Sequence, residues 1–178
     1  MGFSKSDGGD TNQTRLDQDE ETFEELFSRP HDHRGKSEKC DFCEITNGHI
    51  ERYVVFEDEF SIAFLDRKPV FIGHTLLIPK IHTETISDLP RKLVGPLFTN
   101  MQLVSRAVQS ALSSDDIFVA INNNVSQSVP HLHIHVVPRK FGDGLKGFFW
   151  PRTKYSSEDQ MNDTKSAIME AVRSLRAS

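Results

Sequence analysis

The stretch PHLHIHVVPR, residues Pro130–Arg139, determines how the rest of the chain is interpreted. Three of the eight histidines in the sequence alternate here with aliphatic residues. Successive side chains of a β-strand point to opposite faces, so a strand would place the aliphatic residues in a core and the histidines about 6–7 Å apart on the other face. These histidines are His131, His133 and His135. A row of imidazoles can bind metal, carry protons or act as a nucleophile.

Outward from this strand, hydrophobic patterns predict a small mixed domain. Alternating or short apolar runs bounded by turn residues predict strands over 53–58, 60–66, 74–80 and 117–123. A helical pattern begins at Ser87 and continues to Leu112 with apolar residues every three or four positions. A short helix follows Cys40 and ends at Asn47-Gly48. Together these elements indicate the α+β class, with a mainly antiparallel sheet and one long helix.

The chain length and local composition predict one domain with a tail. The 178 residues suit a single domain. Residues 1–38 are polar and acidic and are predicted to be a disordered tail, whereas residues 39–178 form the domain. The domain ends in an amphipathic helix over about 157–176, which opens with a Ser157…Gln160 capping-box spacing.

Charge and cysteine content narrow the function classes. The net charge of −5 and the pI near 5.9 argue against binding nucleic acid through its phosphates. No apolar run reaches the ~18 residues of a membrane helix, so no stable membrane association is expected. Two cysteines and no secretory signal favour a reducing compartment, cytoplasmic or also nuclear. The start MGFSKS matches a loose acylation pattern, but the bulky Phe3 beside Gly2 argues against acylation.

The pair Cys40 and Cys43 has the spacing of a metal or redox site. Zinc takes four nitrogen or sulfur ligands, and this pair supplies two of them. With no further cysteine, histidines would supply the others, and the candidates are His82 and one member of the histidine row. The alternatives are a redox pair, which lacks a thioredoxin-like βαβ context, and two incidental buried thiols.

Two further groups of residues suit a nucleotide ligand. The polar loop NNNVSQSV precedes the histidine strand, and it can aim Asn123, Gln127 and Ser128 at phosphate oxygens or form a simple hairpin turn. Asp66 ends a strand, where a carboxylate can accept both ribose hydroxyls or only form a turn. The side chains that could wall an adenine pocket are Phe42, Ile45 and Phe64.

With these residues in view, the sequence resembles the histidine-triad (HIT) superfamily of nucleotide hydrolases and transferases. HLHIHVV fits the family signature, and CDFCEI, FEDEFSIAFLD, GHTLLIPKIH and QSVPHLHIHVVPR resemble family blocks in family order. The resemblance covers about Cys40 to Arg139. It implies a five-stranded antiparallel sheet with a long helix, and a homodimer whose sheets join.

The resemblance also implies roles for particular residues. His133 takes the place of the nucleophile that attacks the α-phosphorus, and His135 that of a residue orienting it and binding phosphate. Ser128 matches a serine that assists the leaving group, and Asp66 matches the ribose-binding acid. Asn123 matches a phosphate-side asparagine, and His74 matches a position behind the triad. A zinc-binding subset of the family implies a structural Zn²⁺ on Cys40, Cys43, His82 and His131.

The expected function is therefore hydrolysis at the α-phosphate of a purine nucleotide, with a phosphoramidate as first substrate. The enzymatic alternative is a dinucleoside polyphosphate, and the alternative of another class is a nucleotide-binding scaffold without catalysis. A module that binds nucleic-acid ends is disfavoured by the acidic charge. One departure from the family concerns the loop before Gln127, which is shorter than in relatives and lacks glycine.

Overall fold

The computed structural model describes residues 40–145 and 154–177, so the predicted tail over 1–38 and the acylation question at Gly2 lie outside the described residues. The chain divides into two compact units, one ending at Asp143 and the other including Gly144 onward. Across the described ranges, every helix is too short or too polar to cross a bilayer.

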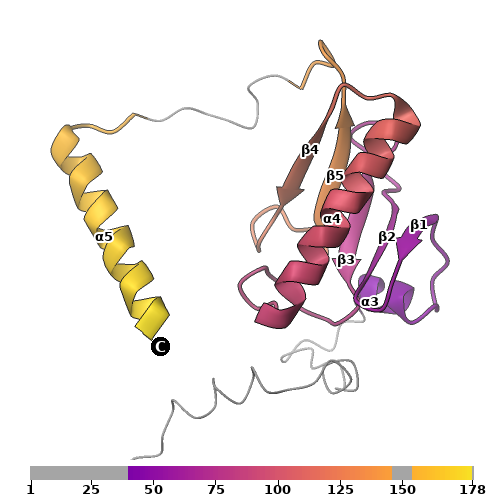
Figure 1. Ribbon diagram of the computed structural model, residues 1–178, viewed down its shortest axis with the longest axis horizontal. Coiled ribbons are helices and arrows are strands. Elements are labelled where there is room, and N and C mark those ends of the chain that lie inside the picture. Colours follow the sequence, from indigo (N-terminus) through magenta and orange to yellow (C-terminus); the bar gives the residue numbers. More distant parts are fainter. Residues whose placement is uncertain (1–39, 146–153, 178) are drawn as a thin grey trace, which may run out of the picture. The chain divides into compact units, whose positions relative to one another are not determined.

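A five-stranded antiparallel sheet forms the centre of the first unit (Figure 1). Its strand order is β1-β2-β3-β5-β4, so β1 and β4 are the two edges. The bounds of the strands are β1 Val54–Glu57, β2 Ser61–Leu65, β3 Thr75–Pro79, β4 Asp116–Ile121 and β5 Ile134–Arg139. The α+β class and the five-stranded antiparallel sheet predicted from the sequence are confirmed.

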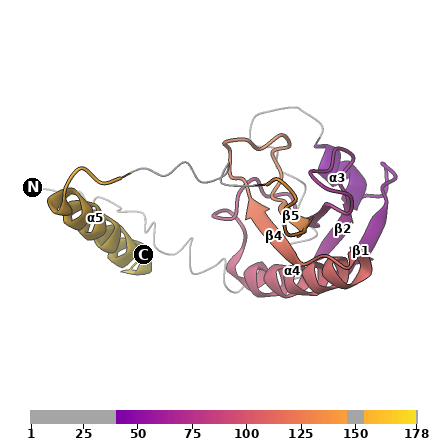
Figure 2. The ribbon, with the colours of Figure 1, turned by 90° about the horizontal axis from the view of Figure 1, so that it is seen from above.

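The two faces of the sheet pack against different helices (Figure 2). The long helix α4, Arg91–Leu112, buries its apolar stripe on one face. Alternate residues of the strands and of the segment before β5 join it there, namely Ala63, Leu77, Leu132, Ile134 and Val136. The short helix α3, Asp41–Thr46, belongs to a second cluster with Ile62, Phe64, Leu76 and Ile78. The period of two along β2 and β3 therefore produces two separate cores.

Two predicted element starts were wrong by three residues or more. The long helix begins at Arg91 rather than Ser87, because Pro90 occupies the N-cap in an extended conformation and a residue before proline avoids the helical region. The histidine strand enters the sheet at Ile134 rather than His131. The reason is that the Leu132 N–H donates to the Thr83 carbonyl at 2.6 Å, outside the strand ladder.

A buried polar contact fixes α4 on the turn between β1 and β2. The Asn100 amide donates to the Asp58 carboxylate at 2.6 Å and lies 3.0 Å from the Ser61 hydroxyl. The other Asp58 oxygen accepts the backbone N–H groups of Phe60 and Ser61. Since a buried polar group is costly without a partner, this network selects one register of α4 on the sheet.

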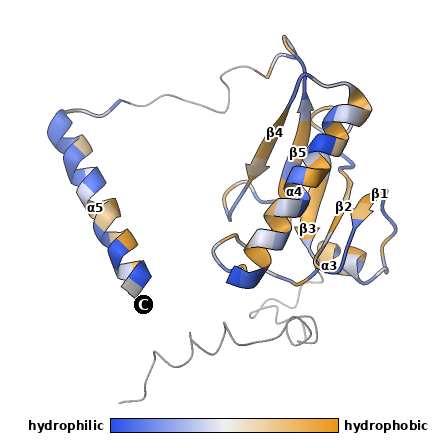
Figure 3. Ribbon diagram, in the orientation of Figure 1, coloured by the Kyte–Doolittle hydropathy of each residue, from blue (hydrophilic) through white to orange (hydrophobic). Residues whose placement is uncertain are grey.

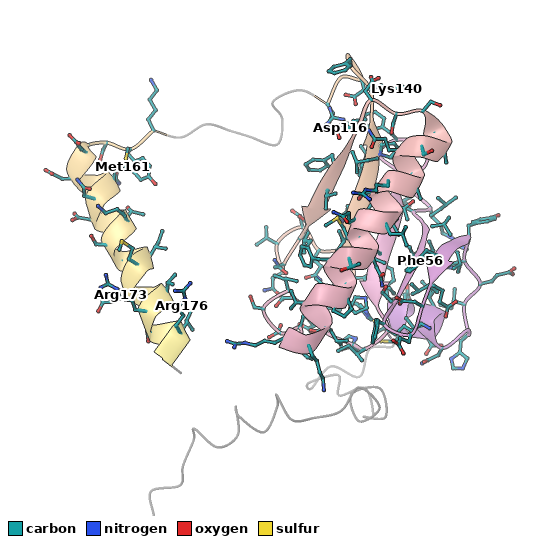
Figure 4. All side chains as sticks on the ribbon, viewed as in Figure 1. Phe56, Asp116, Lys140, Met161, Arg173 and Arg176 are labelled. Atoms are coloured by element: carbon teal, nitrogen blue, oxygen red, sulfur yellow. The ribbon has the colours of Figure 1, made fainter. Side chains whose placement is uncertain are left out.

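The second unit contains α5, Glu158–Ala177, close to the predicted range of 157–176. Ser157 accepts the Gln160 N–H at 3.1 Å, as a capping box requires, but Gln160 reaches back to the Ser156 N–H instead of that of Ser157. Figure 3 shows mostly hydrophilic colours along α5, with hydrophobic patches between them. Its labelled side chains in Figure 4 are Met161, Arg173 and Arg176.

Candidate functional site

The segment that carries the histidine row is extended, and its alternate side chains point to opposite sides of the sheet. Leu132, Ile134 and Val136 are fully buried on the α4 side. On the other side, the Phe42 ring of α3 makes T-shaped contacts with the rings of both His131 and His133, at centroid distances of 5.8 and 5.4 Å. The alternation in the sequence therefore separates core from chemistry as the period of two predicts.

Cys40, Cys43, His82 and His131 form one compact cluster. One ligand atom from each of the four lies within 4.8 Å of the others. His82 Nδ1 is 3.2 Å from the Cys43 sulfur, and His131 Nδ1 is 3.5 Å from the Cys40 sulfur. A tetrahedral zinc with ordinary bond lengths holds sulfur and nitrogen ligands about 3.5 Å apart. The spacing and chemistry of these donors therefore fit Zn²⁺.

The protonation pattern of the cluster also suits a metal. The other His131 nitrogen, Nε2, lies 2.9 Å from the Pro79 carbonyl, which can only accept, so Nε2 carries the proton and Nδ1 is left as a lone pair. Hydrogen bonding by the Cys43 thiol lowers the pKa of Cys40, and the same bond raises the pKa of Cys43. A carbonyl that orients a ligating histidine is a common outer contact in zinc sites.

His133 is held in the tautomer that a nucleophile needs. It is 2% exposed, and its Nδ1–H donates to the carbonyl of His131 at 2.7 Å. The proton on Nδ1 leaves a lone pair on Nε2. Burial lowers the pKa of His133, which keeps the ring neutral near pH 7.

A chain of hydrogen bonds sets the tautomer of His135. The Val70 N–H points at His74 Nδ1 at 3.3 Å, so His74 carries its proton on Nε2. His74 Nε2 then donates to His135 Nδ1 at 3.0 Å, which places the His135 proton on Nε2. That Nε2 is buried and has no hydrogen-bond partner among the described residues. A buried donor without a partner suits an oxygen of an incoming anion.

Asp66 lies beside this series of hydrogen bonds and contacts His74. One carboxylate oxygen accepts the Lys68 N–H at 2.8 Å, and the other is 3.3 Å from His74 Nδ1. The direction of the Val70 N–H is fixed by the backbone, whereas a carboxylate can rotate, so we assign the His74 tautomer from Val70. Asp66 remains a predicted ribose ligand, now placed next to the residue that orients His135.

The three predicted base-contacting residues lie together in the α3 core. Phe42, Ile45 and Phe64 are 8%, 4% and 2% exposed. The Phe42 and Phe64 rings meet edge to face at 5.6 Å. Because Phe42 also touches His133, this cluster adjoins the histidine row. Its contact with a base stays a prediction.

Two side chains of the loop before the histidines bind backbone groups of neighbouring segments. Asn123 Oδ1 accepts the Ile86 N–H at 3.0 Å, while Ser128 is exposed. The Gln127 amide donates to the carbonyls of Glu84 and His131. Phosphate contacts by Asn123, Gln127 and Ser128 stay predictions. The structure shows in addition that Asn123 and Gln127 bind backbone groups. These bracing contacts could not be predicted from the sequence, because the partners are backbone groups.

The lowered pKa of His135 predicts that the protein loses stability in acid. Burial, followed by the charges of His133 and His74, lowers the pKa of His135 from 6.5 to about 4. Below pH 6.5 the unfolded chain binds a proton at this residue that the folded chain does not, so the free energy of unfolding falls until about pH 4. The shift is worth up to about 3 kcal/mol. In urea unfolding, His135→Asn should lose less stability over this range than the unmodified protein.

The exposed His49 provides the control, since its side chain is 65% exposed. His49→Asn should follow the unmodified protein. Any metal released in acid from the cluster of Cys40, Cys43, His82 and His131 would be lost equally by the unmodified protein and both variants. Its effect on stability therefore cancels in the comparison. Parallel curves for the unmodified protein and His135→Asn would contradict the assignment.

Comparisons with known proteins agree with this geometry. A family model described as HIT domain matches residues 47–142. The chain is 35% identical over 108 residues to an Arabidopsis thaliana protein named adenylylsulfatase HINT3, covering 60% of this chain and 55% of that one. It is 32% identical over 116 residues to adenosine 5'-monophosphoramidase HNT1 of Saccharomyces cerevisiae, covering 63% and 70%. The structure of a Zn-bound histidine triad family protein from Mycobacterium smegmatis superposes with a TM-score of 0.57 at 33% identity, covering 76% and 96%.

Proposed function

This chain belongs to the HIT domain family, and from that premise we propose that it hydrolyses purine nucleotides at the α-phosphate through a nucleotidyl-histidine intermediate. The observation that carries the proposal is the tautomer of His133. Its Nδ1–H is bound to the His131 carbonyl, which leaves Nε2 as the reactive lone pair. A neutral imidazole is a competent nucleophile near neutral pH.

The reaction divides into two displacements. In the first, His133 Nε2 forms a bond to the α-phosphorus while the bond from phosphorus to the leaving group breaks. The Ser128 hydroxyl would give its proton to the leaving group. In the second, water attacks the phosphorus and gives its proton to the Ser128 oxygen, the bond to Nε2 breaks, and the mononucleotide leaves with His133 neutral again. The free His135 Nε2–H would bind the phosphate oxygen on which charge accumulates.

The proposed substrate is an adenylyl conjugate, with AMP phosphoramidate first. Two relatives carry names that state an adenylyl phosphoramidate or an adenylyl sulfate activity. Since the chain spans 55% of the adenylylsulfatase, that activity is the weaker guide. Asp66 would hold the ribose, Phe42, Ile45 and Phe64 the base, and Asn123 the phosphate side.

The test is AMP release measured by chromatography, for the unmodified protein and His133→Ala in parallel. The substrates are adenosine 5′-phosphoramidate, adenylyl sulfate and a dinucleoside polyphosphate. Release from the phosphoramidate that depends on His133 supports the proposal. Release only from the dinucleoside polyphosphate favours the second enzymatic candidate. AMP binding without any release favours a scaffold.

We further propose a structural zinc at the cluster of cysteines and histidines. Cys40, Cys43, His82 and His131 would fill all four positions of a tetrahedral ion, leaving none for substrate. When bound, the ion would supply a cross-link between α3, the segment after β3 and the segment that precedes β5. His131 would thus be a ligand through its side chain while its carbonyl positions His133.

The proposed partner is a second copy of the chain. Strand β4 is an open edge of the sheet, and its Val119 is 38% exposed. The outer surface of α4 presents further apolar side chains, Val94, Phe98 and Leu103. Open strand edges favour pairing with another strand, which would join two sheets.

A charge on this edge should separate the copies. Val119→Lys is expected to convert a dimer into a monomer, measured by size-exclusion chromatography with light scattering, because a buried unpaired charge is costly at an interface. Val55→Lys on the opposite edge strand, where Val55 is 52% exposed, is the matched control and should stay dimeric. A dimer for Val119→Lys at micromolar concentration would contradict the assignment of this edge.

A further inference from the structure

The side chain of Gln127 lies where three segments meet beside the nucleophile. Its Oε1 accepts the Asn124 N–H at 2.8 Å. Its Nε2 donates to the Glu84 carbonyl at 2.7 Å and to the His131 carbonyl at 3.3 Å. A glutamine amide has two hydrogens to donate, so both are directed at backbone carbonyls.

One of these carbonyls is shared with the nucleophile. The His131 oxygen accepts the Gln127 amide and also the Nδ1–H of His133, at 2.7 Å. A carbonyl oxygen has two lone pairs and can accept both bonds. Gln127 is therefore separated from the His133 ring by a single backbone oxygen, and its contact helps to fix the direction of that oxygen.

The loop that carries Gln127 needs such support. Asn124 and Ser126 have φ angles of 62° and 61°, the left-handed region that favours glycine. Val125 between them is 81% exposed and contributes little packing. Strained backbone persists where its surroundings determine it, and Gln127 binds the N–H of Asn124 directly.

We propose that Gln127 is a positioning residue for His133, an inference that rests on the function proposed above. Gln127 holds the short loop, the Glu84 segment and the His131 carbonyl in one arrangement. That arrangement keeps the proton of His133 on Nδ1 and its lone pair on Nε2. A role as phosphate donor would require Gln127 to release both carbonyls first.

The experiment compares Gln127→Met and Gln127→Glu with the unmodified, metal-loaded protein. Methionine has a similar length and lacks the amide, whereas glutamate keeps the acceptor for Asn124 and loses the donor. In both variants kcat for AMP release from adenosine 5′-phosphoramidate should fall about 10- to 100-fold, with KM unchanged within about twofold. Nitrogen-15 NMR of the resting protein should show the two His133 ring nitrogens moving toward a tautomeric average.

Asn122→Ala is the matched control, because Asn122 braces the same loop by donating to the Ser126 carbonyl at 3.4 Å rather than to the carbonyl of His131. It should retain kcat and the His133 resonances. A raised KM with unchanged kcat and unchanged resonances would overturn the proposal in favour of phosphate contact. Loss of folding in both Gln127 variants would overturn it in favour of a purely structural role. The NMR readout needs no substrate, so it decides the proposal even if the protein releases no AMP.

Discussion

His133→Ala is expected to reduce AMP release by about 10⁴-fold or more while leaving nucleotide binding nearly intact. Among the histidines whose tautomer the described structure fixes, only His133 has its Nδ1–H bound to a backbone carbonyl and a lone pair left on Nε2. The variant removes this imidazole. Without a nucleophile the first displacement has no covalent route. The measurements are single-turnover AMP release and AMP affinity by calorimetry.

Free imidazole offers a sharp control for this variant. It fits the space left by the side chain and should restore part of the activity in His133→Ala, whereas it should leave His135→Asn unaffected because that variant still has its nucleophile. A radiolabelled adenylyl group should become attached to the unmodified protein and not to His133→Ala. Turnover by His133→Ala equal to that of the unmodified protein would refute the covalent mechanism.

The sequence predicted the architecture well because its signals there are local. The alternation in residues 131–137 has a period of two, and the stripe ending at Leu112 has the helical period, so strand and helix could be told apart. The Cys40–Cys43 spacing likewise indicated a metal pair. His82 and one histidine of the row were candidates from the residues alone, whereas the choice of His131 rested on family resemblance. The structure brings all four residues together.

The finer arrangement of the site depends on contacts between distant residues. His74 binds His135 across 61 positions, and Gln127 binds the Glu84 carbonyl across 43. A backbone carbonyl or N–H leaves no mark in the sequence, so the acceptors at Pro79 and His131 could not be anticipated. The same is true of the Val70 N–H that selects the tautomer of His74.

Removal of a cysteine ligand is expected to have the second large effect, which is on zinc content and thermal stability. Cys43→Ser is expected to reduce bound zinc from about one ion per chain to none and to lower Tm by roughly 10 °C, since a ligand at 1,000 times its Kd adds about 4 kcal/mol to the free energy of unfolding. Helix α3 has six residues, too few to be stable alone, so we expect the proposed cross-link to add to its packing against the sheet. Metal analysis and thermal unfolding provide the measurements.

The loss of metal should also reach the nucleophile. His131 supplies a ring nitrogen to the cluster and its carbonyl to His133, so a displaced His131 would release the His133 Nδ1–H. We therefore expect Cys43→Ser to lower kcat and to speed amide hydrogen exchange in α3. His49→Ala, which changes an exposed histidine near the same helix, should alter neither zinc content nor Tm. A fully active and equally stable protein after complete metal removal would exclude the cross-link.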